Sequence, residues 1–376
     1  MGMRPSGMLR WFGLLAMLIL REAVPLSAAP PYPPSTAIGG VEFDWSTHVR
    51  LAPGSDNWPI TWADDDHQYA SWGDGGGFGG TNTDGRVSLG FARIEGDKRN
   101  YKGYNVWGGK APENAARFGG KSYGVLCVDG VLYKWWGPGS GTTSYTESRL
   151  CKSSNDGATW TKASWGFVKA QRLIMPTILN FGRNYAGTRD EYVYHYFVRL
   201  QGDPSDLNVH VPGKIDLARV PQKTLMDRTA YEFFAGTDEG GRPRWTSDPD
   251  ERRPVFENPA GVGWNLSVSY NPGLKRYLLC TEHTATFEGR LGMFDAPEPW
   301  GPWTTVLYTE GAEVFGAGRI ETSTFFWNFS NKWLSPDGRD FVLLFTGINT
   351  NDSWNTVEGS FRVMPDTAPE STAPAQ

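Results

Sequence analysis

The sequence is poor in cysteine and histidine. It has 3 cysteines, Cys127, Cys151 and Cys280, and 5 histidines among 376 residues. The cysteines are odd in number, and neither residue type shows the spacing of a zinc site, so we expect buried free thiols. No cofactor is expected. A structural calcium ion at the acidic turn 64–66 is the one exception left open, although a solvated hairpin is the preferred interpretation there.

Long runs of one charge and long apolar runs are also scarce. The net charge is −5 without a run of one sign, which argues against a nucleic-acid partner. The one apolar run, residues 11–20, follows Arg4 and Arg10 and precedes small residues at 26–29. This order is typical of a secretory signal, and the run is too short to span a bilayer comfortably. We expect a signal peptide at 1–29, a secreted or periplasmic protein, and no membrane partner after signal removal; an uncleaved anchor is the alternative.

Aromatic residues, glycine and proline are abundant, with 17 Trp, 20 Phe, 15 Tyr, 46 Gly and 26 Pro. Aromatic side chains fit pleated surfaces and Gly and Pro interrupt them, so the composition predicts many short strands. Five passages share one order of apolar strand, turn, aromatic-rich strand and third strand; they begin near residues 56, 122, 173, 265 and 321. The repeat predicts an all-β, five-bladed β-propeller over residues 39–364, with a β-sandwich as the alternative.

The regions around the propeller have their own signals. Residues 30–38 are Pro-rich and predict an extended spacer, and residues 365–376 predict a disordered tail. The strand near Phe361 is expected either to close the ring against the N-terminal strand near 41–43 or to end its own blade. Residues 154–160 resemble the Asp box of sialidases, in which Asp156 would bond turn amides and Trp160 would pack beneath. We expect a monomer.

Two acidic residues occupy special places in the first passage. In a propeller, the start of each innermost strand and the end of the next strand meet at one mouth of the central cavity, and Asp56 and Asp74 hold those places. A hairpin turn centred on Asp65 would place Asp56 directly opposite Asp74. Two carboxylates this close repel each other and one pKa rises, which is the pairing that glycoside hydrolysis requires. A pair of loop-capping carboxylates is the alternative.

The same placement rule collects further polar and aromatic side chains at this mouth, where rings can stack on sugars and charged or amide groups can bond hydroxyls. The candidate substrate-binding residues are Trp58, Lys121, Trp136, Arg172, Arg199, Asn265, Glu282, His283 and Glu321. Residues 75–80 match G-x-G-x-x-G, but no helix is expected after them, so they are interpreted as a mobile loop at the cavity mouth.

The first passage resembles a known family. The stretch Asp56 to Asp64, followed by Trp72 to Gly75, is similar to five-bladed glycosidase propellers of the former domain of unknown function 4185, now glycoside hydrolase family 183, which includes endo-D-arabinanases. The resemblance implies that Asp56 and Asp74 form a catalytic acidic pair. In the more distant family 43, a first-blade Asp is the base and a Glu from a later blade is the acid, which would pair Asp56 with Glu282 or Glu321.

Together these features predict a secreted glycoside hydrolase acting on a cell-wall or extracellular polysaccharide, such as an arabinan-like furanoside. Asp56 is the preferred base or nucleophile and Asp74 the preferred acid, although the carboxyl in the drier pocket should be the acid. A non-catalytic carbohydrate-binding propeller and a polysaccharide lyase are the alternatives. Sugar, linkage, endo or exo action and stereochemistry stay open.

Overall fold

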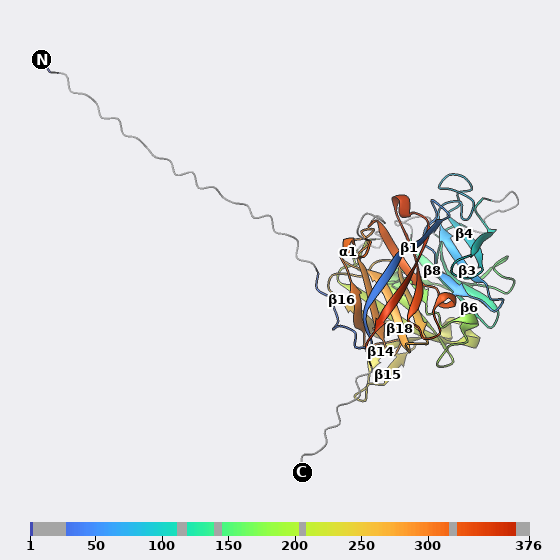
Figure 1. Ribbon diagram of the computed structural model, residues 1–376. Coiled ribbons are helices and arrows are strands. Elements are labelled where there is room, and N and C mark those ends of the chain that lie inside the picture. Colours follow the sequence, from blue (N-terminus) through green and yellow to red (C-terminus); the bar gives the residue numbers. More distant parts are fainter. Residues whose placement is uncertain (3–27, 111–118, 139–144, 203–207, 316–321, 366–376) are drawn as a thin grey trace, which may run out of the picture.

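The computed structural model describes residues 1–2, 28–110, 119–138, 145–202, 208–315 and 322–365 (Figure 1). The expected signal peptide and C-terminal tail lie almost wholly outside these ranges, as does Glu321. Among the described residues, no helix is long and apolar enough to cross a membrane.

The described strands form five small antiparallel sheets, each built outward from an innermost strand. The first blade contains β2 (Ile60–Trp62), β3 (Gln68–Gly73), β4 (Leu89–Glu95) and β5 (Lys102–Trp107). The second contains β6 (Lys121–Val128), β7 (Val131–Gly137) and β8 (Glu147–Ser153), with β9 (Thr161–Lys162) and β10 (Phe167–Val168) paired to β8. The third contains β11 (Leu173–Ile178), β12 (Tyr192–Arg199), β13 (Gly213–Pro221), β14 (Glu232–Thr237) and β15 (Pro243–Thr246), with β16 (Pro254–Asn258) on β13.

The fourth blade contains β17 (Leu266–Asn271), β18 (Arg276–Glu282), β19 (Leu291–Ala296) and β20 (Thr304–Tyr308). The fifth contains β21 (Thr324–Phe329), β22 (Asp340–Gly347), β23 (Trp354–Val363) and β1 (Ile38–Leu51). Helical structure is limited to α1 (Ala312–Phe315) and the 3₁₀ turns η2 (Lys169–Gln171), η3 (Arg183–Tyr185), η4 (Gln222–Thr224), η5 (Arg228–Ala230), η6 (Pro249–Glu251), η7 (Asn331–Trp333) and η8 (Asn349–Asn351) in the described part of the chain.

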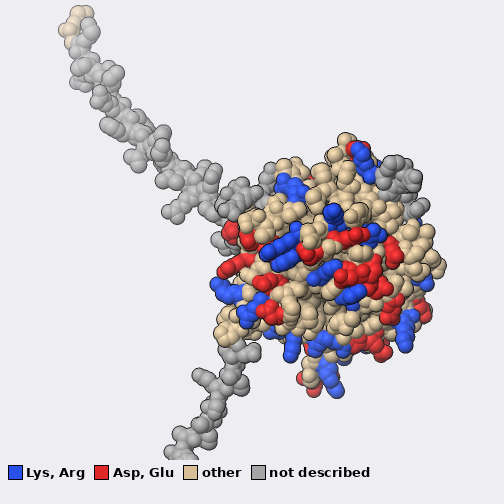
Figure 2. All heavy atoms as spheres, turned by 45° about the vertical axis from the view of Figure 1, so that its right-hand side comes forward, with Lys and Arg blue, Asp and Glu red and all other residues tan. Residues whose placement is uncertain are grey.

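The sheets form the predicted all-β, five-bladed propeller. The innermost strands contact one another around the axis, β2 with β6, β6 with β11, β11 with β17 and β17 with β21. Every residue of β3, β11, β17, β19 and β21 is buried, because these strands are covered on both faces by neighbouring blades. On the face seen in Figure 2, Lys and Arg are interleaved with Asp and Glu instead of forming one patch.

The fifth blade closes the ring with both ends of the chain. Val41 pairs with Phe361 and Phe43 with Gly359, and Figure 1 shows the blue β1 beside the red C-terminal strands. This confirms the first of the two closures predicted for the last strand. Within the Pro-rich stretch at 30–38, the Ser35 amide donates to the Thr305 carbonyl on β20 at 2.8 Å, so this stretch contacts the fourth blade.

Two smaller predictions can be checked on the blades. The three cysteines are buried and unpaired, as expected. In the turn at 154–160, Trp160 packs edge-on against Phe91 at 5.1 Å between ring centroids. The amides of this turn, however, are held by Ser153 Oγ and by Asn155 Oδ1, which accepts from the Thr159 amide at 3.0 Å, and not by Asp156 as predicted.

Candidate active site

The first hairpin keeps the predicted register only near its turn. Ile60 pairs with Ala70, but the next bridge joins Asp56 to Gly73. The first strand therefore has one residue more than its partner between these two pairs, and Asn57 there adopts a left-handed φ of 63°. The prediction that Asp56 lies directly opposite Asp74 is wrong by one position.

Asp74 lies just beyond the end of β3 and is bound by two cations. It adopts a left-handed φ of 55°, which turns the chain away from the strand. Lys121 Nζ, from the start of β6, lies 2.7 Å from Asp74 Oδ1, and Arg86 Nη2 lies 3.2 Å from Oδ2. Both carboxylate oxygens are thus in ion pairs, and 34% of the side chain is exposed.

Asp56 lies beside the same lysine without an ion pair of its own in the described part of the chain. A methyl group added at Gly73 would lie 3.1 Å from Asp56 Oδ1 and 3.3 Å from Lys121 Nζ, so a glycine there leaves room for both groups. Enclosure by protein raises the pKa of Asp56 to about 7; Lys121 opposes this rise, and the charges of Asp352 and Asp74 add to it.

Asp352, which follows η8 in the fifth blade, is the third carboxyl at this end of the propeller. Its carbonyl accepts from the Gly54 amide at 2.6 Å, two residues before Asp56. Its Oδ1 is buried without a hydrogen-bond partner among the described residues. Burial and the charge of Asp74 raise the pKa of Asp352 to about 6. We call Asp56, Asp74, Asp352, Lys121 and Arg86 the mouth cluster.

The sequence interpretation missed Asp352 and Arg86. Both lie in loops that leave the end of a second strand, β22 for Asp352 and β3 for Arg86. The rule that selected Asp74 would have found Asp352 if the loop after β22 had been included. Arg86 follows a glycine-rich stretch that carries no signal for a cation at the site.

Asn265 belongs to the support of the site. It is buried and donates to Asn57 Oδ1 across the axis, from the fourth blade to the first. Asn57 in turn donates to the Ser122 carbonyl at 3.4 Å. These amides hold the irregular segment that carries Asp56.

Glu282 and His283 are enclosed at the end of β18. Glu282 accepts from the Phe287 amide at 2.8 Å and from Thr286 Oγ1 at 3.1 Å, and burial raises its pKa to about 8. His283 stacks on Tyr308 with ring centroids 3.7 Å apart, and burial lowers its pKa to about 4. Neither side chain has exposed surface in this structure.

The two predicted tryptophan platforms are both engaged in contacts with other protein groups. Trp58 is 1% exposed and packs against Trp72 and Trp354, so it has no free face for a sugar. Trp136 is half-buried; it donates to the Gly119 carbonyl, and Lys162 Nζ lies 3.4 Å from its ring centroid.

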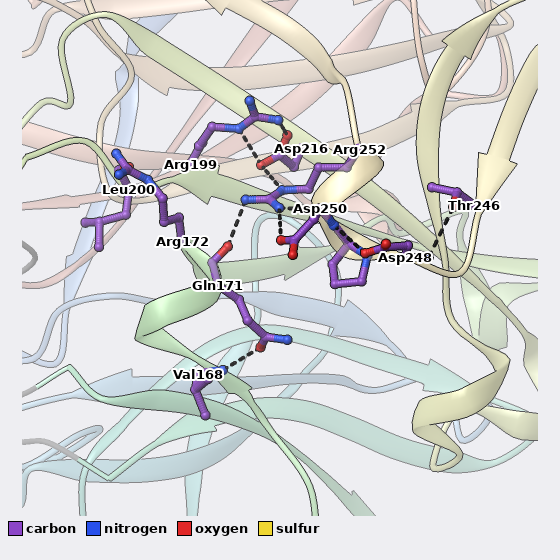
Figure 3. Close-up of polar contacts among 11 residues, drawn as sticks. Val168, Gln171, Arg172, Arg199, Leu200, Asp216, Thr246, Asp248, Asp250 and Arg252 are labelled. Carbon is purple, nitrogen blue, oxygen red and sulfur yellow. Dashed lines mark hydrogen bonds and ion pairs between the residues drawn. The ribbon is translucent and has the colours of Figure 1, made fainter.

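Arg172 and Arg199 lie on the third blade (Figure 3). Arg172 is exposed and donates to the Leu200 carbonyl at 2.6 Å. Arg199 forms an ion pair with the buried Asp216. Among the described residues, neither arginine forms an ion pair with a member of the mouth cluster.

The acidic turn and the glycine-rich segment are both held by protein groups. Asp65 accepts from the Tyr69 hydroxyl at 2.8 Å, and Asp66 pairs with Lys332 at 3.2 Å. No group of three or more His, Cys, Asp or Glu among the described residues is arranged to hold a metal ion. In the segment 75–80, the Gly77 amide donates to Ser55 Oγ at 2.9 Å, so this loop is tied to the residue before Asp56.

Comparison with known families identifies the family of this chain. The family model described as domain of unknown function (DUF4185) matches residues 93–322, more than half of the chain. The chain belongs to this family. The span that matches DUF4185 includes Lys121 but neither Asp56, Asp74 nor Asp352, so the acidic part of the mouth cluster lies outside it. No curated protein matches this DUF4185 chain in sequence.

Solved structures resemble the DUF4185 chain in fold. An inferred hydrolase from Bacteroides ovatus ATCC 8483 superposes with a TM-score of 0.50 at 12% identity, covering 85% of this chain and 90% of that one. The GH43_1 enzyme from Xanthomonas citri gives 0.45 at 13% identity, covering 87% and 90%. The catalytic domain of the Coprinopsis cinerea GH62 α-L-arabinofuranosidase gives 0.46 at 12% identity, covering 88% and 96%.

Proposed function

We propose that this DUF4185 propeller is a secreted glycoside hydrolase that cleaves a cell-wall or extracellular polysaccharide. The observation that carries the proposal is the mouth cluster, in which three carboxyls lie close to two cations and the pKa of Asp56 is near neutral. Hydrolysis of a glycosidic bond requires one carboxyl that can give a proton and one that is ionised. The Bacteroides ovatus protein of the same fold, itself an inferred hydrolase, is consistent with this class.

Asp56 is the proposed proton donor. A pKa of about 7 leaves a large fraction of this carboxyl protonated at neutral pH. By the criterion that the drier carboxyl is the acid, this assignment reverses the initial preference for Asp56 as base. A donor with a pKa near the working pH combines the correct protonation state with a strong tendency to give up the proton.

Asp74 is the proposed ionised partner, acting as base or nucleophile. Its ion pairs with Lys121 and Arg86 are those of a charged carboxylate, whereas Asp56 has no ion pair in the described part of the chain. Asp352 adds negative charge that raises the pKa of Asp56. An oxocarbenium-like transition state gains positive charge at the sugar, and the ionised carboxylate of Asp74 would stabilise that charge.

A second arrangement keeps hydrolysis but assigns the acid differently. Glu282 has a pKa raised to about 8, as a proton donor requires, and would act with Asp56 as in family 43. It is enclosed by Phe287 and Thr286 in this structure, which is why we prefer Asp56. Variants at both positions separate the two arrangements.

A polysaccharide panel tests the proposed reaction. The purified protein is incubated with arabinans, xylans, galactans and pectins, and both new reducing ends and the absorbance of unsaturated uronates are measured. Reducing ends without absorbance support hydrolysis. Absorbance indicates a lyase, and binding without product indicates a carbohydrate-binding propeller; either result would overturn the proposal.

A further inference from the structure

A groove on the third blade carries a second group of charged residues. Two adjoining cavities of about 910 and 450 Å³ share Arg199, Lys214, Asp250 and Arg252 in their walls. Arg199 ends β12 and pairs with Leu173 at the start of β11, so the groove is at the same end of the propeller as the mouth cluster. The residues lining it include no member of that cluster.

The floor of the groove is built around one buried carboxylate. Asp216 on β13 is 0% exposed. Arg199 donates from Nε to Asp216 Oδ2 at 2.9 Å and from Nη2 to Oδ1, while Arg252 donates from Nε to Oδ2 at 2.9 Å (Figure 3). Two guanidinium groups thus share one negative charge, which leaves a positive excess at the floor.

The guanidinium groups are fixed before any ligand arrives. Arg252 also donates to the Gln171 carbonyl at 2.8 Å and to the Pro249 carbonyl, and its side chain is 8% exposed. The ion pair uses Nε and Nη2 of Arg199, whose Nη1 lies outside it. Planar donors held in place lose little entropy on binding a carboxylate.

The smaller cavity is the more basic part of the groove. Arg172, Arg199, Lys214 and Arg252 line it, against a single lining carboxylate, Asp250, whose side chain is 89% exposed. Lys214 is 3.0 Å from the largely exposed Glu257, a pair that solvent screens strongly. An anion that enters this cavity therefore meets four cations, against the buried Asp216 at the floor and the solvated Asp250, whose Oδ1 lies 4.0 Å from Arg252 Nη1.

The larger cavity adds an apolar wall. Phe234, Trp300 and Pro302 line it, and Trp300 is half-buried with its ring in edge contact with Trp245 at 6.1 Å. An aromatic wall beside a row of charged donors suits a sugar ring, whose apolar face stacks while its substituents form hydrogen bonds.

We infer that this groove binds an acidic glycan, with a uronate carboxylate held by Arg172, Arg199 and Lys214 above the floor that Arg252 helps to form, and a neighbouring sugar ring placed against Trp300. The site would anchor the protein to an acidic polysaccharide through residues that the proposed hydrolysis does not use. The inference stands independently of the proposed function.

Calorimetric titration with oligogalacturonate tests this inference on the intact protein. Wild-type binding should weaken steeply with added salt, because the contact is largely ionic. The double variant R172Q/K214Q should bind at least 10-fold more weakly, and W300A should also bind more weakly. The matched control K98Q/R339Q removes a lysine and an arginine whose partners, Glu358 and Asp337, lie elsewhere, and should bind as wild type does.

Four outcomes would overturn the inference. These are no binding by the wild type, equal binding of a neutral arabino-oligosaccharide, and loss of binding in D56N, which would place the ligand in the mouth cluster. The fourth outcome combines two results: inorganic polyphosphate displaces bound oligogalacturonate as strongly as free oligogalacturonate does, and W300A binds as wild type does. Together these results would indicate an anion site without a sugar site. If R172Q/K214Q does not fold, K214Q alone replaces it, because Lys214 pairs only with an exposed glutamate in the described structure.

Discussion

The mouth cluster and the groove on the third blade, which Arg199 and Arg252 line, both contain buried or enclosed carboxyls, but the surroundings of these carboxyls differ. In the mouth cluster, Asp56, Asp74 and Asp352 share two cations, and the pKa of Asp56 rises to about 7. In the groove, Asp216 is the more deeply buried, but it is held between two guanidinium groups. Asp216 forms ion pairs with both guanidinium groups, whereas Asp56 forms none in the described part of the chain and burial raises its pKa.

The comparison predicts its largest effect on activity. D56N keeps the size of the side chain and removes its proton transfer, so kcat/KM on the polysaccharide identified by the panel should fall about 10²–10⁴-fold. D74N should lose activity on a similar scale. D340N, at the start of β22 on the opposite end of the blade, is the matched control and should behave as wild type. Near-normal D56N and D74N with an inactive E282Q would replace this pair by the family 43 arrangement.

The groove predicts an effect on stability at constant pH. D216N leaves the guanidinium groups of Arg199 and Arg252 without their shared charge, and we expect the free energy of unfolding to fall by about 3 kcal/mol. Urea denaturation at pH 7 measures it, with D337N as the control because the Asp337–Arg339 pair is exposed. A loss equal to that of D337N would show that the buried carboxylate is not an anchor.

Opposite charges around Asp56 should move the pH profile in opposite directions. A proton donor must be protonated, so kcat/KM should decline as pH rises through about 7. Removing the negative charge in D352N lowers the pKa of Asp56 and moves this decline to lower pH, whereas K121Q removes a positive charge and moves it to higher pH, each by about 1 pH unit. Shifts in the same direction would contradict the assignment of Asp56 as the titrating group.

A pH-dependent effect on stability follows from the same pKa. The folded-state pKa of Asp56, about 7, lies above the value of about 3.9 for an unfolded Asp. The folded chain therefore binds this proton more tightly, and the contribution of Asp56 to stability declines as pH rises from 4 to 7. D56N should be more resistant to urea than wild type at pH 8, and the difference should vanish near pH 4. A constant difference across this range would argue against the raised pKa.

The fold followed from the sequence more closely than the site did. Five repeated hairpins specify five blades, and closure by the strand at Val41 and Phe43 follows from apolar strands at both ends of the chain. The register at Asp56 could not be predicted, because the extra residue near Asn57 depends on Asn265 from the fourth blade.

The roles of individual aromatic and basic residues also depended on distant contacts. From the sequence alone, a tryptophan at the position of Trp58 can either stack on a sugar or pack in the core. The contacts of Trp58 with Trp72 and Trp354 show that it belongs to the core. Arg199 obeys the strand-end rule, but its direction is set by Asp216 on the neighbouring strand. Long-range partners of this kind leave no local pattern in the sequence.

The protonation of Asp56 is the central claim, and carboxyl ¹³C NMR titration measures it directly without any substrate. The Asp56 signal, assigned by its absence in D56N, should titrate near pH 7 in the wild-type protein and at lower pH in D352N. An Asp56 carboxyl that titrates near pH 4 in both proteins would contradict the account, because it would then be fully ionised at neutral pH and unable to donate a proton.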